Sequence, residues 1–351
     1  MSIKTPKVSV CIPTYNRPEF LKQAIESVLA QTFSDYELII SDNASADTTT
    51  AVISSFKDRR IIHIRKEKNI GLVDNWNNCL SAAKGQYITI FHDDDHMLPD
   101  NLTFKIEALD RNERAGMIHS NFHIIDENGS ITQENAHFIK SQDIVETGAS
   151  FLRKSLLGYN PINVSSVVIR KECYDKLGGF SKKVHFTTDL EFWMRISMHY
   201  DVIYLAKPLI EYRMYHKDGW TSSQYVTEID GATYSNLKGL EDEYTTRKII
   251  LQQIKHIFSD WKNVNGSVRN RMIGSVNRVV ENNFLRCGKK GEALKSIYQV
   301  CKDSPDLLLD ISMTKLILKA FIGLRTTGVL KRILMNPRDD NRGRAGGKGS
   351  N

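Results

Sequence analysis

The sequence predicts an α/β fold with a mostly parallel central sheet flanked by helices, followed by a helical C-terminal extension. Short apolar runs rich in β-forming residues alternate with amphipathic helical segments through the first hundred residues. This alternation is typical of parallel sheets with helices on both faces. From about residue 224 to 336 the pattern becomes helical and amphipathic without strong β signals. The 351 residues, 41% of them hydrophobic, suffice for one large domain or two smaller ones.

Hydrophobic periodicity assigns the individual elements of the first hundred residues. The expected strands cover residues 8–16, 36–42, 61–67 and 86–91. The expected helices cover residues 17–31, 45–56 and 74–85. Pro18 stands near the start of the first helix, Ser45 is a capping residue for the second, and Gly85 ends the third. Leu98-Pro99 then turns the chain sharply into a further helix.

The rest of the chain contains fewer strands. Residues 115–126 and 163–180 indicate further strands, the latter leading into a helix and a glycine turn, and residues 187–200 form an amphipathic helix. Residues 201–219 indicate a strand pair, or one strand with a loop. We expect a catalytic domain over 1–223, with halves near 1–100 and 101–223, a helical region over 224–336 and a disordered basic tail over 337–351.

Polar residues follow each of the first four predicted strands. Ligands of open α/β sheets bind outside the carboxyl ends of the strands. The residues at these ends are Thr14, Tyr15, Asn16, Arg17, Asp42, Asn43, Asn69, Gly71 and the run Asp93, Asp94 and Asp95. The sequence therefore predicts a ligand site at this edge of the sheet.

The three adjacent aspartates after the fourth strand predict a divalent cation. Adjacent carboxylates repel one another unless a cation neutralises them, and Mg²⁺ and Mn²⁺ prefer oxygen ligands. A solvated acidic turn without a ligand is the alternative. His92 and His96 flank the run, but residues four apart on a strand-to-loop segment do not share one face, which argues against a joint metal site.

Two segments resemble family 2 glycosyltransferases of the GT-A (nucleotide-diphospho-sugar transferase) fold. Residues 8–49 carry "PTYNR", "SVLAQTF" and "SDNAS" at the spacing of that family. Residues 68–100 are similar to its next block, which ends in the metal-binding DxD-type motif. The likeness continues to about residue 220, and several motifs occur in the expected order. It implies a metal-dependent, inverting enzyme that uses a nucleoside-diphosphate sugar. UDP is the expected nucleotide, because uracil is the usual base in this family.

The resemblance assigns the donor side of the site. Asp42 matches the acidic residue that hydrogen-bonds the base, although an Asx turn is the alternative role. Asp94 matches the usual direct ligand of Mn²⁺ or Mg²⁺, with Asp95 beside it, and Asp93 would serve the ribose or a metal-bound water. His92 stands where the family more often has an acid. The nucleotide-binding residues expected are Pro13, Thr14, Tyr15, Asn16, Arg17, Asp42, Asn69, Gly71, Asn75 and Asp93.

The resemblance also assigns a catalytic base. Counting back from Trp193 and Arg195, Asp189 falls on the base position, and Glu191 could assist or substitute. A carboxylate with an ordinary pKa of about 4 is ionised at pH 7 and can take the acceptor proton. A plain helix N-cap is the alternative role of Asp189.

Residues 212–223 are similar to the closing loop of the family. His216 matches a histidine that approaches the metal or diphosphate, and Arg213 and Lys217 would add phosphate contacts together with Ser222 and Ser223. Trp220 is either an acceptor platform or ordinary loop packing.

Two other functions would leave different marks on the sequence. A nucleotidyltransferase of sugar phosphates would normally carry a glycine-rich phosphate loop after the first strand, and "IPTYNRPEF" contains no glycine. No P-loop or dinucleotide motif occurs either. A catalytically inactive GT-A-like binding module would keep the fold but lose the acids, whereas Asp42, Asp94 and Asp189 are all present.

Composition and charge suggest the cellular setting. The five cysteines form no CxxC pattern and there is no signal peptide or long apolar run, as expected for a cytoplasmic protein. The net charge of +7 permits anionic partners. Residues 315–336 are apolar with interleaved basic residues, which fits the cytoplasmic face of the inner membrane or a packed terminal helix. We expect a glycan or lipid-linked acceptor, a possible homodimer, no nucleic acid, and a role in bacterial surface polysaccharide synthesis.

Overall fold

A computed structural model describes residues 5–136, 141–157, 162–214, 226–229, 232–235, 237–254 and 264–268 of the chain. The chain divides into two compact units. The first contains residues 1–224 and 242–268, and the second contains residues 225–241 and 269–351. The first unit therefore includes residues 242–268, which lie in the region that the sequence assigns to a separate helical part.

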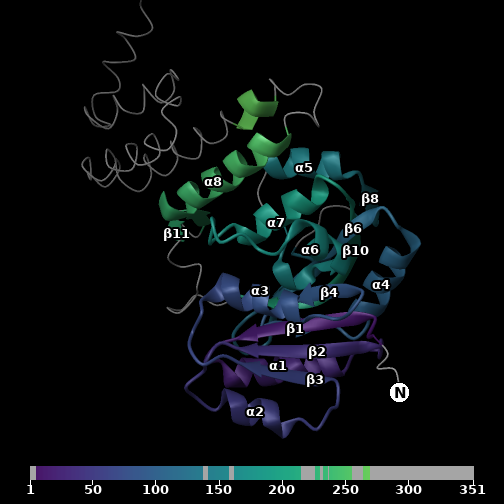
Figure 1. The fold of residues 1–351 in the computed structure, drawn as a ribbon, viewed down its shortest axis with the longest axis vertical. Coiled ribbons are helices and arrows are strands. Elements are labelled where there is room, and N and C mark those ends of the chain that lie inside the picture. The colour runs from purple at the N-terminus through teal and green to yellow at the C-terminus, as the bar shows by residue number, and fades with distance from the viewer. Residues whose placement is uncertain are drawn as a thin grey trace, which may run out of the picture. The chain divides into compact units, whose positions relative to one another are not determined.

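The first unit is built around one mixed sheet (Figure 1). Its strands, in the order β3-β2-β1-β4-β9-β6-β10-β5, are β3 (Ile61–Arg65), β2 (Tyr36–Asp42), β1 (Val8–Thr14), β4 (Tyr87–Ile90), β9 (Val168–Arg170), β6 (Ala115–Ile125), β10 (Asp201–Arg213) and β5 (His96–Met97). β7 (Ile131–Gln133) pairs with β6, and β8 (Ile144–Glu146) pairs with β10. β1 to β4 are mutually parallel, as are β6 and β10, whereas β9 runs antiparallel to both of its neighbours.

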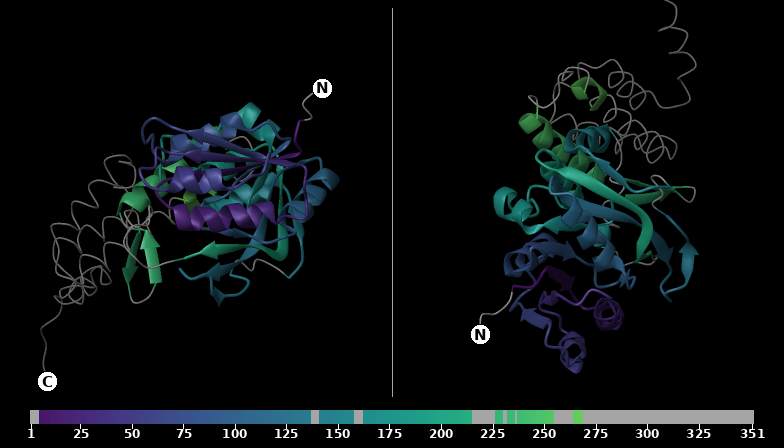
Figure 2. Two further views of the ribbon diagram at one scale, coloured as in Figure 1. Left: turned by 90° about the horizontal axis from the view of Figure 1, so that it is seen from below. Right: turned by 90° about the vertical axis from the view of Figure 1, so that its right-hand side faces the viewer.

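Helices cover both faces of this sheet (Figure 2). One face is packed by α1 (Pro18–Leu29), α2 (Thr49–Ser55) and α4 (Asn101–Arg111). The opposite face is packed by α3 (Leu72–Ala82), α5 (Gly148–Leu157), α6 (Lys171–Leu177) and α7 (Thr188–Ser197). The 3₁₀ turn η1 (Val164–Ser166) leads into β9.

The strands alternate between two apolar cores, as the period of two in a strand requires. In β1, Val10 and Ile12 point to the core under α1, whereas Cys11 points to the core under α3. All residues of β1, β2 and β4 are buried, which is typical of parallel strands covered on both faces. Apolar burial on both faces thus fixes the strands whose ends carry the site.

Most of the predicted elements are confirmed, and the differences are local. α2 begins at Thr49 rather than at Ser45, because the Ser45 hydroxyl accepts a hydrogen bond from the Asn16 amide instead of capping a helix. Of the two alternatives for residues 201–219, the single strand is confirmed: residues 201–213 form one long strand, with register shifts around Pro208, which cannot donate to the ladder. The structure also contains α5, β5, β7 and β8, for which the sequence analysis gave no prediction.

In the second unit the structure describes a two-stranded hairpin, β11 (Val226–Ile229) with β12 (Ala232–Ser235). The expectation of an all-helical region from residue 224 onward is wrong at this point. α8 (Leu237–Ile254) follows, and its residues from Asp242 onward belong to the first unit. Within the part of the chain that the structure describes, none of the helices is both long and apolar enough to cross a bilayer. Residues 315–336 and the tail lie outside the described residues.

Candidate active site

The acidic run forms a tight turn between β4 and β5 at the carboxyl end of the parallel strands. All three carboxylates are buried: the exposed fractions of Asp93, Asp94 and Asp95 are 6%, 7% and 0%. A solvated acidic turn would leave its side chains in water. The arrangement is therefore a built site, held by specific partners from several elements.

Asp93 is held by the end of β1. The Thr14 hydroxyl donates a hydrogen bond of 2.6 Å to Asp93 Oδ2, and Arg17 Nη1 lies 3.5 Å from Asp93 Oδ1. The same guanidinium nitrogen lies 2.8 Å from Asp94 Oδ2. Burial, followed by the negative charge of Asp94, raises the pKa of Asp93 to about 7, against the opposing effects of Arg17 and Thr14. A positive charge placed here would therefore be stabilised.

Asp95 is held by residues far along the chain. The backbone amide of Arg213 donates to Asp95 Oδ1 at 2.9 Å, and the Ser165 hydroxyl donates to Asp95 Oδ2. The Ser165 hydroxyl oxygen also accepts the His92 amide at 3.0 Å. Burial and the charge of Asp94 raise the pKa of Asp95 well above its usual range. The turn is thus fixed on one side by η1 and on the other by the end of β10.

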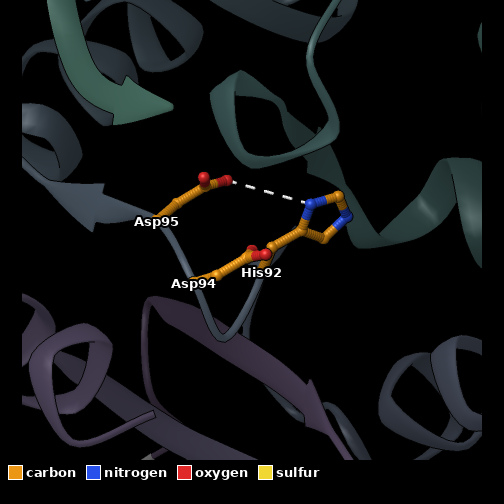
Figure 3. A group of neighbouring side chains, drawn as sticks. All are labelled: His92, Asp94 and Asp95. Carbon is orange, nitrogen blue, oxygen red and sulfur yellow. Dashed lines mark ion pairs between the residues drawn. The ribbon is translucent and has the colours of Figure 1, made fainter. Parts of the chain in front are cut away.

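His92 joins two of the aspartates in a possible cation site. Donor atoms of His92, Asp94 and Asp95 all lie within 4.8 Å of one another, and Figure 3 shows the three side chains around the turn. His92 Nδ1 lies 3.8 Å from Asp95 Oδ2, and Nε2 is buried with no hydrogen-bond partner among the described residues. Burial lowers the pKa of His92, which favours the neutral imidazole that can ligate a metal. The two carboxylates suit Mn²⁺ or Mg²⁺, whereas the imidazole is a ligand more typical of transition metals.

His96 takes no part in this cluster. Its Nδ1 lies 3.0 Å from Glu211 Oε2, and its Nε2 lies within 3.0 Å of Gln23 Oε1 and of the Arg213 guanidinium. The backbone reverses within the turn, so the two histidines separate: His92 faces the cluster and His96 lies in β5. The sequence argument that they do not act together is consistent with this geometry, but it gave no reason to favour His92.

Arg213 supports the turn and is not available as a phosphate contact, contrary to the expectation from the sequence. Its guanidinium donates to the backbone oxygens of Asp94, Asp126 and Glu127, at 2.8, 2.8 and 3.0 Å, and to Gln23 Oε1. The residue is 1% exposed. Arg213 therefore joins the acidic turn to α1 and to the β6–β7 turn. The other loop residues expected at the site, His216, Lys217, Trp220, Ser222 and Ser223, lie outside the described residues.

The polar residues after β1, β2 and β3 come together as expected. The Asn43 amide donates to the Thr14 carbonyl at 3.0 Å, and its side chain contacts Asn69 Oδ1 at 3.0 Å. The Asn69 side chain accepts the Gly71 amide, and Gly71 has a φ of 85°, which favours glycine. Asn16 also has a positive φ, of 55°, and its side chain accepts the Ala46 amide. These contacts align three strand ends along one rim.

Asp42 is fully buried at this rim. Its carboxylate accepts hydrogen bonds from the Ser45 amide at 2.8 Å and from Arg65 Nη1 at 2.6 Å. Burial alone would raise the pKa of Asp42, but the hydrogen bonds from Ser45 and the charge of Arg65 outweigh it and lower the pKa. The bond to Ser45 is the Asx-type turn considered in the sequence analysis. Asp42 remains an anion. A base N–H that donated to its carboxylate would do so beside the hydrogen bond from Arg65.

The other residues expected to bind the nucleotide differ in their access to a ligand. Tyr15 is 45% exposed at the rim, whereas Pro13 is buried within β1 beside Ser41 of β2. Asn75 is 3% exposed, and both ends of its amide bond to Ser41: the Ser41 hydroxyl donates to Oδ1 and the side-chain Nδ2 donates to the Ser41 carbonyl. Asn75 thus ties α3 to β2, and a ligand would have to displace Ser41 to reach it.

The two acids of α7 have different surroundings. Asp189 lies half-buried in the first turn of the helix, where the helix dipole favours a carboxylate. Glu191 is 3% exposed and forms a two-contact ion pair with Arg195, at 2.9 and 2.8 Å. Arg195 in turn donates to the carbonyls of Leu177 and Gly179. Glu191 is therefore part of the contact that holds the glycine turn before α7.

Aromatic side chains connect the acidic turn to α7. The rings of His92 and Trp76 lie 5.4 Å apart, and those of Trp76 and Phe180 lie 4.9 Å apart. The ring centroid of Phe180 lies 4.9 Å from that of Phe192 and 6.0 Å from that of Trp193. Asn77 of α3 accepts the Phe180 amide and donates to its carbonyl. The turn that carries the cation cluster and the helix that carries Asp189 thus share one packed layer.

Comparison with known proteins agrees with this architecture. The family described as glycosyl transferase family 2 matches residues 9–169. An uncharacterized glycosyltransferase of Methanocaldococcus jannaschii is 32% identical over 222 residues, which are 62% of this chain and 74% of that protein. The GalNAc(5)-diNAcBac-PP-undecaprenol beta-1,3-glucosyltransferase of Campylobacter jejuni is 33% identical over 132 residues, 37% of this chain and 42% of that protein.

Two solved structures share the fold at low sequence identity. S. aureus TarS 1-349 in complex with UDP-GlcNAc has a TM-score of 0.59 at 14% identity and covers 89% of this chain and 91% of its own. The mannosyltransferase PcManGT from Pyrobaculum calidifontis, in complex with GDP-Man and Mn2+, has a TM-score of 0.52 at 14% identity, with 91% and 88% covered. The fold is therefore that of GT-A glycosyltransferases, and the chain belongs to glycosyltransferase family 2 and is an enzyme of that type.

Proposed function

We propose that this glycosyltransferase is metal-dependent and inverting, and that it moves a sugar from a nucleoside-diphosphate sugar, with UDP as the favoured nucleotide, to a hydroxyl group. The observation that carries the proposal is the cluster of His92, Asp94 and Asp95, in which both carboxylates are buried and the donor atoms lie within 4.8 Å of one another. It lies at the end of β4, beside the polar residues that end β1 and β2. The complexes of TarS with UDP-GlcNAc and of the mannosyltransferase with GDP-Man and Mn2+ support this choice.

We assign the metal ligands to Asp94 and Asp95, with His92 as a third, and His216 as a further candidate from the sequence. Mn²⁺ or Mg²⁺ bound there would neutralise the diphosphate as it leaves. Asp93 would bind the ribose or a metal-bound water; burial and the negative charge of Asp94 raise its pKa to about 7.

The nucleotide would lie along the rim. Asp42 would accept a hydrogen bond from the base, next to Arg65, and the exposed Tyr15 ring would border the base or ribose. Arg17 spans Asp93 and Asp94, so a diphosphate would compete with these carboxylates for its charge. Two side-chain contacts would shape this rim. Asn16 accepts the Ala46 amide, and Asn69 accepts the Gly71 amide.

We assign the catalytic base to Asp189. The acceptor oxygen forms a bond to the anomeric carbon from the face opposite the leaving group, and its proton passes to the Asp189 carboxylate. The bond from the anomeric carbon to the diphosphate oxygen breaks with its electron pair on that oxygen. This single displacement inverts the anomeric centre. Glu191, paired with Arg195, stabilises the glycine turn before α7 instead of taking the proton.

The acceptor would be a glycan or a lipid-linked sugar in cell-surface polysaccharide synthesis. The name of the Campylobacter jejuni relative describes an undecaprenol-diphosphate-linked acceptor, which supports a lipid-linked substrate. We place the enzyme in the cytoplasm, with contact between residues 315–336 and the anionic inner membrane surface. The C-terminal region would also form a homodimer.

A thermal-shift panel tests the donor site. UDP, GDP, dTDP, CDP and ADP are each added with and without Mn²⁺ to the wild type, to Asp94→Asn and to Asp100→Asn. A ligand at a hundred times its Kd stabilises the native state by about 2.7 kcal/mol. We expect one diphosphate, UDP first, to stabilise the wild type only with Mn²⁺, and Asp94→Asn to lose this shift. Asp100, which has a 47% exposed side chain outside the cluster, is the matched control.

Donor hydrolysis then tests the chemistry. Asp189→Asn should retain the metal-dependent UDP shift but release nucleotide from UDP-glucose or UDP-GlcNAc at least a hundredfold more slowly, since general-base catalysis contributes about 10²–10⁴-fold. A wild type that binds nucleotide and metal but hydrolyses and transfers nothing would favour the inactive binding module. Absence of both binding and release would contradict the proposal.

A further inference from the structure

We infer that Asp242 of α8 is a positioning residue for the active site, because it fixes the start of α7 and with it Asp189. The inference rests on the proposed function, in which Asp189 is the base. Asp242 lies beyond residue 223, where the sequence ends the catalytic domain, and beyond residues 9–169 of the family match. Nevertheless Asp242 belongs to the first compact unit.

The Asp242 carboxylate binds the segment immediately before α7. Its two oxygens accept the His185 amide at 2.9 and 3.1 Å. Oδ2 also accepts the Thr187 amide at 2.7 Å and the Thr187 hydroxyl at 2.9 Å. Hydrogen bonds to an ionised carboxylate are about twice as strong as neutral ones. One side chain therefore holds two of the three residues that precede the helix.

Thr187 departs from the usual behaviour of a residue at its position. It is the N-cap of α7, where a threonine hydroxyl commonly accepts an amide of the first helical turn. Here it makes no such bond within the described residues. The hydroxyl instead contacts Asp242 and lies 2.8 Å from the Thr246 hydroxyl. The beginning of α7 is thus set by α8, two residues before Asp189.

α8 itself is well anchored against the helices around it. Arg247, five residues after Asp242 and 2% exposed, donates to the Leu156 carbonyl of α5 at 3.2 Å. Ile250 packs in an apolar cluster with Leu190 and Met194 of α7. Since the helix is fixed by this packing, loss of the Asp242 carboxylate should loosen the 185–187 segment without detaching α8.

A carboxylate at this place also suits the charge distribution. Asp242 is 9% exposed, so its charge is compensated by the donors it contacts and not by water. It lies at the positive end of the α7 dipole, which favours anions. Asparagine in its place would keep the shape but turn an N–H group toward backbone amides that also donate.

The experiment compares Asp242→Asn with Glu243→Gln in the full chain. Both variants remove one negative charge from the same turn of α8, but the Glu243 carboxylate pairs with Arg247, whereas the Asp242 carboxylate binds His185 and Thr187. Hydrogen exchange of the peptide spanning residues 184–190 is measured by mass spectrometry. We expect at least tenfold faster exchange at His185 and Thr187 in Asp242→Asn, and wild-type exchange there in Glu243→Gln.

Activity separates positioning from general stability. Asp242→Asn should lower kcat for hydrolysis of UDP-glucose or UDP-GlcNAc with Mn²⁺ at least tenfold, with KM within twofold and the UDP–Mn²⁺ thermal shift retained. Thr187→Val should lose part of the rate and Thr187→Ser should restore it, because serine keeps the hydroxyl. Unchanged exchange in Asp242→Asn would overturn the inference, as would faster exchange with an unchanged kcat.

The two proposals fail in different ways. If the wild type neither binds nucleotide nor hydrolyses donors, the proposed function fails, and the exchange measurement still decides whether Asp242 holds the segment before α7. If the wild type is active and Glu243→Gln lowers kcat as much as Asp242→Asn, loosening of α8 as a whole explains both variants and the positioning role is overturned.

Discussion

Lys105 is predicted to destabilise the native protein at neutral pH. The residue lies on α4 against the apolar core and is fully buried. Its Nζ has no hydrogen-bond partner among the described residues. Burial lowers the pKa of Lys105 to about 7. In the unfolded chain the amine has its ordinary pKa of about 10.4. Folding therefore removes a proton at pH 7.5, and this removal costs free energy.

The size and sign of the effect follow from the two pKa values. Each pH unit between them is worth about 1.36 kcal/mol, so the cost is about 4 kcal/mol at pH 7.5 and about 1 kcal/mol at pH 9.5. Between pH 7 and 10.4 the unfolded chain binds more protons than the native protein, so the free energy of unfolding rises with pH. Lys105→Met keeps a similar shape and removes the titrating group. It should stabilise the protein by up to about 4 kcal/mol at pH 7.5 and by much less at pH 9.5.

Urea unfolding followed by tryptophan fluorescence at both pH values measures this difference. Lys22→Met is the matched control, because the Lys22 side chain is 60% exposed. Its free energy of unfolding should stay within about 0.5 kcal/mol of the wild type at both pH values. The reasoning is refuted if Lys105→Met destabilises the protein at pH 7.5, or if its gain is the same at pH 7.5 and 9.5.

Three further predictions concern the supports of the site. Arg213→Met should lower the free energy of unfolding by about 3 kcal/mol in urea titrations, since several buried acceptors lose a charged donor; a change below 1 kcal/mol would contradict the supporting role. Ser165→Ala should weaken Mn²⁺ binding about tenfold, as measured by calorimetry, because Asp95 loses the hydrogen bond from the Ser165 hydroxyl. Ser166→Ala should bind Mn²⁺ like the wild type, because the Ser166 hydroxyl donates to the Asn163 carbonyl. Glu191→Gln should lose about 3 kcal/mol of stability, because it breaks a buried ion pair, while kcat of the folded enzyme stays within threefold; a hundredfold loss of kcat would make Glu191 the base.

The strand ends were predictable from the sequence because their pattern is local. Apolar runs such as β1 and β4 are fixed by burial on both faces, and the residues after them must then meet at one edge. This reasoning brings Thr14 to Asp93, and Asn43 to Asn69, without knowledge of any tertiary contact. It was confirmed for the fold and for the proximity of these residues.

The supports of the site were not predictable in the same way. Arg213 and Ser165 contact the acidic turn across 118 and 70 residues of sequence, and nothing in their neighbours indicates a partner. His92 and His96 each stand next to the aspartate run in the sequence. Only the fold of the turn shows which of them faces the cluster. The β11–β12 hairpin was also missed, although Asp230-Gly231 between its strands is a common hairpin signal.

The distribution of contacts around α7 has a consequence for the construction of chimeric enzymes from relatives. The rim that would select the nucleotide lies within residues 9–169, whereas α7 and its anchor on α8 lie between residues 188 and 254. An exchange of the first segment alone would keep Asp189, Thr187 and Asp242 from a single parent. A junction placed near residue 223 would instead combine the start of α7 from one parent with α8 from another. A chimera designed to change donor specificity should therefore take all of residues 170–268 from one parent.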